Sequence, residues 1–140
     1  MNKNAEAILF CFLKDGKILL EDRGQGFENE TFFPSGRVEE KDKLKKGNYL
    51  ENALLREVKE EFNNKIFIKE KEYKGLVSVP EINLDFHLYL ITNWEGTFPQ
   101  VIKEPNEPDS KIAFFPIHIA RKMFKYESAL KMLDLILKNN

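Results

Sequence analysis

The chain has 140 residues, of which 42% are hydrophobic and 32% are charged, and its formal net charge is −1. This length and composition are typical of one globular domain, here residues 1–140, and the balanced charge gives no reason to expect a nucleic-acid duplex or a membrane as partner. The single cysteine, Cys11, excludes an intramolecular disulfide. No apolar run approaches the ~20 residues that span a bilayer, so we expect a cytoplasmic protein. We expect it to be a monomer or a homodimer.

The first third of the chain is predicted to form strands. Residues 6–13 (EAILFCFL) are almost entirely apolar, which favours a strand buried on both faces. A turn at residues 14–16 returns the chain into a second strand at residues 17–23. A brief third strand at residues 31–33 then leads into a tight turn at residues 34–36 (PSG).

A charged segment and a helix follow. Residues 39–48 (EEKDKLKKGN) are almost wholly charged and are expected to form a mobile, solvated loop. The stretch LENALLREVKEEFNN at residues 50–64 has helical periodicity and predicts a helix over residues 49–62. Its apolar side chains recur on one face, which would dock the helix on the core; they are Leu54, Leu55, Val58 and Phe62.

Three acidic residues of this helix fall on the adjacent face. Glu57, Glu60 and Glu61 are three and four residues apart, so their side chains should form one patch. Like charges at this spacing repel each other, and a hard divalent cation such as Mg²⁺ would offset the repulsion. Arg56 precedes Glu60 by one turn and could hold a carboxylate in a bidentate fork. A merely solvated acidic face is the simpler alternative.

The second half returns to strand patterns. Residues 66–79 alternate β-type and charged side chains, which predicts one or two strands with a bend near residues 74–75. Residues 86–92 (FHLYLIT) predict another strand, in which His87 is interpreted as structural rather than catalytic. Residues 93–96 (NWEG) are expected to form a turn.

The C-terminal part is predicted to end in helix. An acidic, Pro-containing loop at residues 100–111 precedes a last strand at residues 112–117. Residues 119–140 are mostly helical by pattern, with one apolar face formed by Ala129, Leu130, Leu133, Ile136 and Leu137. The order of strands, helix, strands and helix predicts the α/β class, with a mixed β-sheet covered by helices on both faces.

Two segments carry a family resemblance. Residues 34–39 (PSGRVE) and 56–61 (REVKEE) resemble the signature of the Nudix (MutT-type) hydrolases, in which Gly, five residues, Glu and seven residues precede Arg-Glu-aliphatic-any-Glu-Glu-any-Gly-aliphatic. The chain departs from this signature in three places. The link between Gly36 and the helix is longer by six residues, Asn48 stands where the first box Glu is counted back from the helix, and Asn63 replaces the closing Gly.

The resemblance implies a Nudix-like α/β/α sandwich with a mixed β-sheet and a set of site residues. The implied ligands of a Mg²⁺ or Mn²⁺ ion are Glu57, Glu60, Glu61 and the backbone carbonyl of Ser35. Arg56 would orient a carboxylate, and a general base is expected on the loop at residues 100–111, with Glu104 preferred to Glu107. Candidate substrate-binding residues are Phe32, Arg37 and Glu107, and one of Lys41, Lys43, Lys45 or Lys46 could reach a substrate phosphate.

The implied activity is metal-dependent hydrolysis of a phosphoanhydride in a small nucleotide. The preferred substrate is a nucleoside triphosphate, such as a modified purine dNTP, cleaved to the monophosphate and pyrophosphate; the small size and the expected turn around Trp94 favour it. ADP-ribose, a sugar nucleotide or a dinucleoside polyphosphate is the alternative substrate. Two interpretations of other classes stay open: a non-catalytic nucleotide-binding module, and a structural α/β domain without a ligand.

Overall fold

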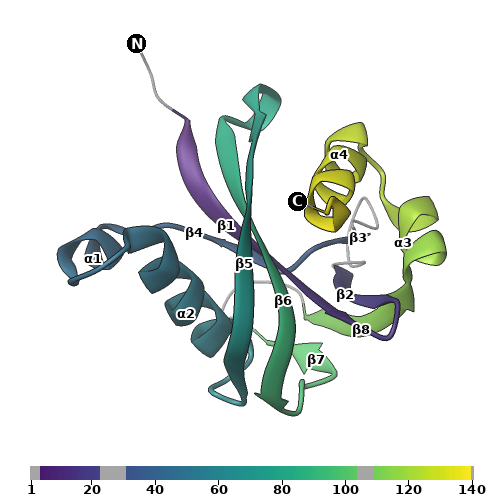
Figure 1. Cartoon of the computed structure of the whole chain (residues 1–140), viewed down its shortest axis with the longest axis horizontal. Coiled ribbons are helices and arrows are strands. Elements are labelled where there is room, and N and C mark those ends of the chain that lie inside the picture. Colours follow the sequence, from purple (N-terminus) through teal and green to yellow (C-terminus); the bar gives the residue numbers. More distant parts are fainter. Residues whose placement is uncertain (1–3, 23–30, 104–108, 140) are drawn as a thin grey trace.

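The computed structural model describes residues 4–22, 31–103 and 109–139 (Figure 1). Within these residues the strands form one eight-stranded sheet with the main order β5-β6-β1-β2-β8-β7, to which β3 is added on β2 and β4 on β1. The strands are β1 (Ala5–Lys14), β2 (Lys17–Asp22), β3 (Thr31–Phe32), β4 (Ser35–Arg37), β5 (Ile66–Val79), β6 (Leu84–Gly96), β7 (Val101–Ile102) and β8 (Ser110–Pro116). The helices are α1 (Glu40–Leu44), α2 (Tyr49–Glu61), α3 (Ile117–Met123) and α4 (Glu127–Leu137), with a 3₁₀ turn at Pro80–Ile82.

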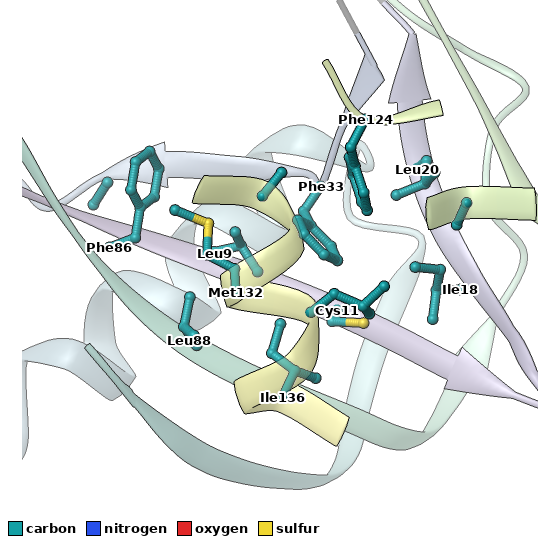
Figure 2. Packing of buried hydrophobic residues seen from close by; sticks show 14 of the residues in the cluster. Leu9, Cys11, Ile18, Leu20, Phe33, Phe86, Leu88, Phe124, Met132 and Ile136 are labelled. Atoms are coloured by element: carbon teal, nitrogen blue, oxygen red, sulfur yellow. The ribbon is translucent and has the colours of Figure 1, made fainter. Parts of the chain in front are cut away.

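Strand β1 divides the core into two layers because its apolar side chains alternate between the two faces of the sheet. One set packs with α3 and α4, and Figure 2 shows two of its members, Leu9 and Cys11, beside Met132 and Ile136 of α4. The other set, which includes Phe10, packs with α2. The prediction of an α/β sandwich built on a mixed sheet is therefore confirmed: β1 pairs in parallel with β6 and antiparallel with β2 and β4.

Four predicted elements differ from the structure. The turn expected at residues 34–36 contains the first two residues of β4, and the loop expected at residues 100–111 contains β7. Residues 39–48 were expected to form a solvated loop, yet they contain α1, whose Asp42 side chain is buried. Residues 93–96 were expected to form a turn, yet they continue β6 and pair with the first residues of β5. Trp94 keeps this end of β6 in the sheet because its ring packs edge-on against Phe12 and lies parallel to Phe114.

The predicted bend in β5 is present. Residues 66–79 form one strand, and its pairing with β6 shifts register between Tyr73 and Gly75. Gly75 has a φ of 124°, a backbone conformation that residues with a Cβ rarely adopt. The strand bends there and changes which of its side chains face the core.

A chain of polar side chains ties the start of α2 to the sheet. Glu6 Oε2 on β1 accepts a hydrogen bond from Tyr49 Oη at 2.7 Å and lies 2.7 Å from His87 Nε2 on β6. His87 Nδ1 is in turn 2.9 Å from the hydroxyl of Tyr73 on β5. Because Tyr49 is the first residue of α2, this chain fixes where the helix begins relative to the sheet.

We expect Glu6→Gln to lower the free energy of unfolding at pH 7 by about 2 kcal/mol, since a charged acceptor of two hydrogen bonds is lost. Burial by itself would raise the pKa of Glu6, but the hydrogen bonds from Tyr49 and His87 outweigh it and lower that pKa. A carboxyl with a lowered pKa stabilises the fold above its unfolded pKa of about 4.3, and this contribution is lost as the pH falls through the folded pKa. Urea unfolding should therefore show a gap between wild type and Glu6→Gln at pH 7 that narrows below about pH 4.

The matched control is Glu81→Gln, because Glu81 is an exposed carboxylate on the 3₁₀ turn. Its stability should stay within about 0.5 kcal/mol of wild type at every pH tested. A gap for Glu6→Gln that stays constant from pH 7 to pH 3 would contradict the assigned role of Glu6.

Among the described residues, no helix is both long enough and apolar enough to cross a membrane.

Candidate functional site

Helix α2 carries most of the predicted site residues. Asn48 Oδ1 accepts hydrogen bonds from two backbone N–H groups of the first turn, at 2.8 and 3.4 Å, as a helix N-cap does. One face of the helix buries Leu54 and Val58, whereas Leu55, which we expected on that face, is 51% exposed. Beyond the helix, Asn63 has a φ of 54°, in the left-handed region that suits Gly or Asn at a helix C-terminus.

Three carboxylates converge beside α2. Glu57 and Glu60 of the helix and Glu39, which precedes α1, each place one oxygen within 4.8 Å of the others. The Glu57 side chain is 12% exposed, while those of Glu60 and Glu39 are about half exposed. Glu57 thus provides a largely buried carboxylate, and Glu60 and Glu39 provide two accessible ones at the rim of the cluster.

The cluster differs from the expected patch in one member. Glu61 is buried and lies outside the group formed by Glu39, Glu57 and Glu60. The helical repeat explains this: Glu61 follows the buried Leu54 by seven residues, which is two turns, so it shares the core-facing side. The spacing of four residues and the family resemblance placed Glu61 beside Glu57, and neither included Glu39, which follows β4 and precedes α1.

The Arg56 guanidinium contacts all three carboxylates. Its Nη1 donates hydrogen bonds to Glu57 Oε1 and Glu60 Oε1, both at 2.9 Å, and lies 3.2 Å from Glu39 Oε2. Its Nη2 also donates to the backbone carbonyl of Arg37 at 2.8 Å. The Arg56 side chain is 10% exposed, so it holds the carboxylates in place from inside the protein.

Asp42 fixes Arg56 in turn and was not predicted. Its two carboxylate oxygens accept from Arg56 Nε at 2.7 Å and Nη2 at 2.9 Å, a bidentate pair. Asp42 also accepts from the backbone N–H of Glu39 at 2.8 Å. The hydrogen bond from Arg56 is the main reason that the pKa of Asp42 lies below its usual range.

The signal for Asp42 was present in the sequence. Five residues separate Gly36 from Asp42, which is the spacing of Gly and the first Glu in the Nudix signature. Counting back from the helix instead assigned this place to Asn48, which the structure shows to be the N-cap of α2. The six additional residues therefore lie between Asp42 and the helix, and an acidic residue is retained at the box position.

Gly36 makes room for the buried carboxylate. A Cβ added to Gly36 would overlap the carboxylate atoms of Glu57, and the φ of Gly36 is not in the left-handed region, so space rather than backbone conformation requires glycine here. Burial is the main cause that raises the pKa of the Glu57 carboxyl, so its ionised form lacks sufficient compensation within the protein. A cation bound by Glu57 would supply that compensation.

We expect Gly36→Ala to lower divalent-metal affinity at least about tenfold, because the added methyl group must displace the Glu57 carboxylate, and to cost roughly 1–3 kcal/mol of stability. Isothermal titration with Mn²⁺ measures the first effect and urea unfolding the second. Ser35→Ala is the matched control: it trims the neighbouring side chain and keeps the backbone carbonyl that we predicted as a ligand. If Gly36→Ala binds Mn²⁺ as wild type does, the Glu57 carboxylate is not a ligand in this position.

The other predicted site residues lie as follows. Ser35 pairs with Leu9 in the sheet. It directly precedes Gly36, the residue that makes room for the Glu57 carboxylate. Phe32 is half-buried and packs against Phe33 and Phe86, so it is part of the core below α4. Arg37 is exposed. Two candidate base residues lie outside the described residues: Glu104 and Glu107.

The donor set fits a hard divalent cation. Carboxylate oxygens with a neighbouring backbone carbonyl are the ligands that Mg²⁺ and Mn²⁺ take in proteins. Neither histidine of the chain belongs to the carboxylate cluster: His87 is engaged with Glu6 and Tyr73, and His118 is exposed on α3. The residues present therefore suit Mg²⁺ or Mn²⁺ better than a metal that prefers nitrogen or sulfur ligands.

Comparison with known proteins adds the identity of the fold. No protein-family model and no curated protein sequence matches the chain. The MutT NUDIX hydrolase structure from Burkholderia pseudomallei matches with a TM-score of 0.71 at 17% identity, covering 96% of this chain and 99% of that one. The E. coli ORF135 protein matches with a TM-score of 0.71 at 22% identity, covering 96% and 89%. An ADP compounds hydrolase matches with a TM-score of 0.66 at 15% identity, covering 96% and 71%.

These matches and the arrangement of the sheet define an α/β/α sandwich in which the acidic helix α2 covers one face and α4 the other (Figure 1). The fold is that of the Nudix hydrolases. The resemblance of residues 34–39 and 56–61 had implied this fold, and the structural matches confirm it.

Proposed function

We propose that the protein is a metal-dependent pyrophosphohydrolase acting on a nucleoside diphosphate derivative. One observation carries the proposal: on a Nudix fold, Glu39, Glu57 and Glu60 each place an oxygen within 4.8 Å of the others, around a buried arginine. Three carboxylates beside two cations, Arg56 and Lys41, keep a net negative charge, which favours a divalent cation. Solvation alone would not require the buried position of Glu57 or the absence of a Cβ at Gly36.

Each residue has a distinct part in the proposed mechanism. Glu57, Glu60 and Glu39, with the Ser35 carbonyl, would hold the metal ion. When bound there, Mg²⁺ or Mn²⁺ would supply charge neutralisation for the phosphates and activation of a water. Arg56 is a positioning residue, because its hydrogen bonds fix the two helix carboxylates while Asp42 fixes Arg56. The chain needs no covalent nucleophile for this chemistry.

We propose Glu104 as the general base, because the loop at residues 100–111 resembles the corresponding loop of MutT-type hydrolases. Pro105 follows it and favours an extended conformation at Glu104. Glu104→Gln should lower kcat by about 100-fold with little change in KM, because general-base assistance is worth that much. Glu107→Gln, measured at the same saturating Mg²⁺, is the matched control and should cost less than about tenfold. The reverse ranking would assign the base to Glu107.

A nucleoside triphosphate, such as a modified purine dNTP, remains the first proposed substrate, with the monophosphate and pyrophosphate as products. The structure removes one reason for this choice, because Trp94 lies in β6 rather than in a turn. The matching structures include both a MutT hydrolase and an ADP compounds hydrolase. ADP-ribose, a sugar nucleotide and a dinucleoside polyphosphate are therefore the alternatives to test beside it.

The deciding experiment is a substrate panel with all these classes, incubated with Mg²⁺ and again with EDTA, in which ion-exchange chromatography separates the nucleotide products from the substrate. A nucleoside triphosphate would give the monophosphate and pyrophosphate, whereas the other classes would give a nucleotide and a second organic phosphate, or two nucleotides. We expect turnover of at least one class with Mg²⁺ and none with EDTA. A melting shift on nucleotide addition without turnover would indicate a binding module instead. Neither turnover nor a melting shift with any class would indicate a structural domain, and both of these outcomes contradict the proposed enzyme.

A further inference from the structure

The lysine-rich segment before α2 brings one of its lysines to the carboxylate cluster. Lys41 Nζ lies 3.4 Å from Glu39 Oε1 and 3.9 Å from Glu60 Oε2, the two rim carboxylates. Lys43, on the same helix, faces elsewhere: its Nζ lies 4.0 Å from Glu40 and 5.6 Å from the centre of the Tyr49 ring. Of the two lysines of α1 that the sequence offered as phosphate contacts, the structure thus favours Lys41.

The two cations at the cluster differ in how firmly they are held. Arg56 is 10% exposed and is fixed by Asp42 and by the backbone carbonyl of Arg37. Lys41 is 58% exposed, and its ion pairs with Glu39 and Glu60 are both longer than 3 Å. A divalent cation taking Glu39 and Glu60 as ligands would compete with Lys41 for the same oxygens. Lys41 is therefore the cation that would give way.

A lysine released in this position has a direct use. Its side chain would stand at the rim of the site, beside the metal ligands, as an exposed ammonium with a flexible stem. The substrate proposed above brings a polyphosphate to this place, and phosphate oxygens form strong charge-assisted hydrogen bonds with an ammonium. Lys41 would thereby exchange two carboxylate partners for a phosphate partner.

We infer that Lys41 is an exchangeable counter-ion: it pairs with Glu39 and Glu60 in the metal-free protein and binds the polyphosphate of the substrate once a divalent cation is bound. The inference rests on the proposed function for the nature of the ligand. Removing the Lys41 charge should therefore raise the affinity for the metal ion and lower the affinity for polyphosphate, because Lys41 opposes the first and supports the second. A lysine that only stabilised α1 would not produce this pair of effects.

The test uses Lys41→Gln and the matched control Lys43→Gln, both in the full chain. Isothermal titration measures the affinity for Mn²⁺ alone, and then for imidodiphosphate, a hydrolysis-resistant diphosphate, in protein saturated with Mn²⁺. For Lys41→Gln we expect Mn²⁺ to bind up to about fivefold more tightly, the range of an exposed ion pair. Imidodiphosphate should bind about tenfold more weakly, the lower range for a hydrogen bond to a charged group. Lys43→Gln should change neither affinity by more than about twofold.

Two outcomes would overturn the inference. Weaker Mn²⁺ binding by Lys41→Gln would show that Lys41 supports the metal site, and unchanged imidodiphosphate binding would show that it does not contact phosphate. Neither readout requires turnover. If the substrate panel is negative while Lys41→Gln shows both expected shifts, the proposed enzyme fails and the counter-ion role stands. If the panel is positive while Lys41→Gln shows neither shift, the enzyme stands and the counter-ion role fails.

Discussion

Replacing Glu57 by Gln is expected to lower kcat/KM by about 1,000-fold while leaving the fold intact. The substitution removes one charge from the metal-binding group, and metal assistance to phosphate chemistry is worth several kcal/mol. The metal-free fold should tolerate it, because burial already raises the pKa of the Glu57 carboxyl and so disfavours its ionised form. Arg56 keeps its hydrogen bonds to Asp42, Glu60 and the Arg37 carbonyl, and the amide oxygen of the new glutamine can still accept from it.

Steady-state kinetics on the best substrate of the panel and Mn²⁺ titration measure this loss. Glu60→Gln should act in the same direction. Glu51→Gln is the matched control, since Glu51 lies on the same helix and pairs with Lys71 at 3.0 Å, away from the cluster; it should keep near wild-type activity. Retention of more than about a tenth of the activity in both Glu57→Gln and Glu60→Gln would refute the metal site on α2.

The largest expected loss of stability comes from Asp42→Asn, about 3 kcal/mol in the free energy of unfolding. Asp42 is 2% exposed and Arg56 10%, and the substitution removes the carboxylate that pairs with Arg56 Nε and Nη2, so that only the partners of Nη1 remain to balance its charge. A loss of this size corresponds to a fall in Tm on the order of 10 °C for a domain of this length. Metal affinity should fall as well, because Arg56 would no longer be held beside Glu57 and Glu60.

The stability difference between wild type and Asp42→Asn should depend on pH in a defined direction. The pKa of Asp42 is lowered in the folded state, mainly by the hydrogen bond from Arg56. Its contribution is therefore present above the unfolded pKa of about 3.9 and is lost as the pH falls through the lower folded pKa. Urea unfolding of wild type and Asp42→Asn should differ at pH 7 and converge in acid.

Two further variants separate charge from position. Asp42→Glu places the residue of the Nudix signature at this site and should retain most of the stability. Glu40→Gln removes an exposed charge of the same helix, and it should stay within about 0.5 kcal/mol of wild type. An Asp42→Asn protein as stable as Glu40→Gln would show that the pair with Arg56 contributes nothing.

The features that sequence predicted well are those set by local periodicity. The apolar run in β1 and the helical repeat of α2 follow from the alternation and spacing of side chains, and both elements have the expected type and place. Burial of Cys11 in the core was likewise predicted. The type of each of these elements follows from the spacing of its own apolar side chains, which can be read from the sequence without knowledge of any contact.

The features that sequence missed depend on contacts between separate segments. Glu39 joins Glu57 only because β4 pairs with β1 and α1 then turns back toward α2. Asp42 was hidden because counting from the helix led to Asn48, although counting from Gly36 would have found it. The strand at Trp94 depends on stacking with Phe114 of β8, a contact that local propensity does not contain.

The burial of the single thiol opens a route to site-specific optical labelling. Cys11 is 0% exposed, and burial raises the pKa of its thiol to about 12, so it should not react with maleimide dyes in the folded protein. Leu44, by contrast, is 84% exposed and lies at the end of α1, one turn from Lys41. A Leu44→Cys protein would therefore carry one reactive thiol, and a fluorophore attached there would report metal and nucleotide occupancy without any other cysteine being removed.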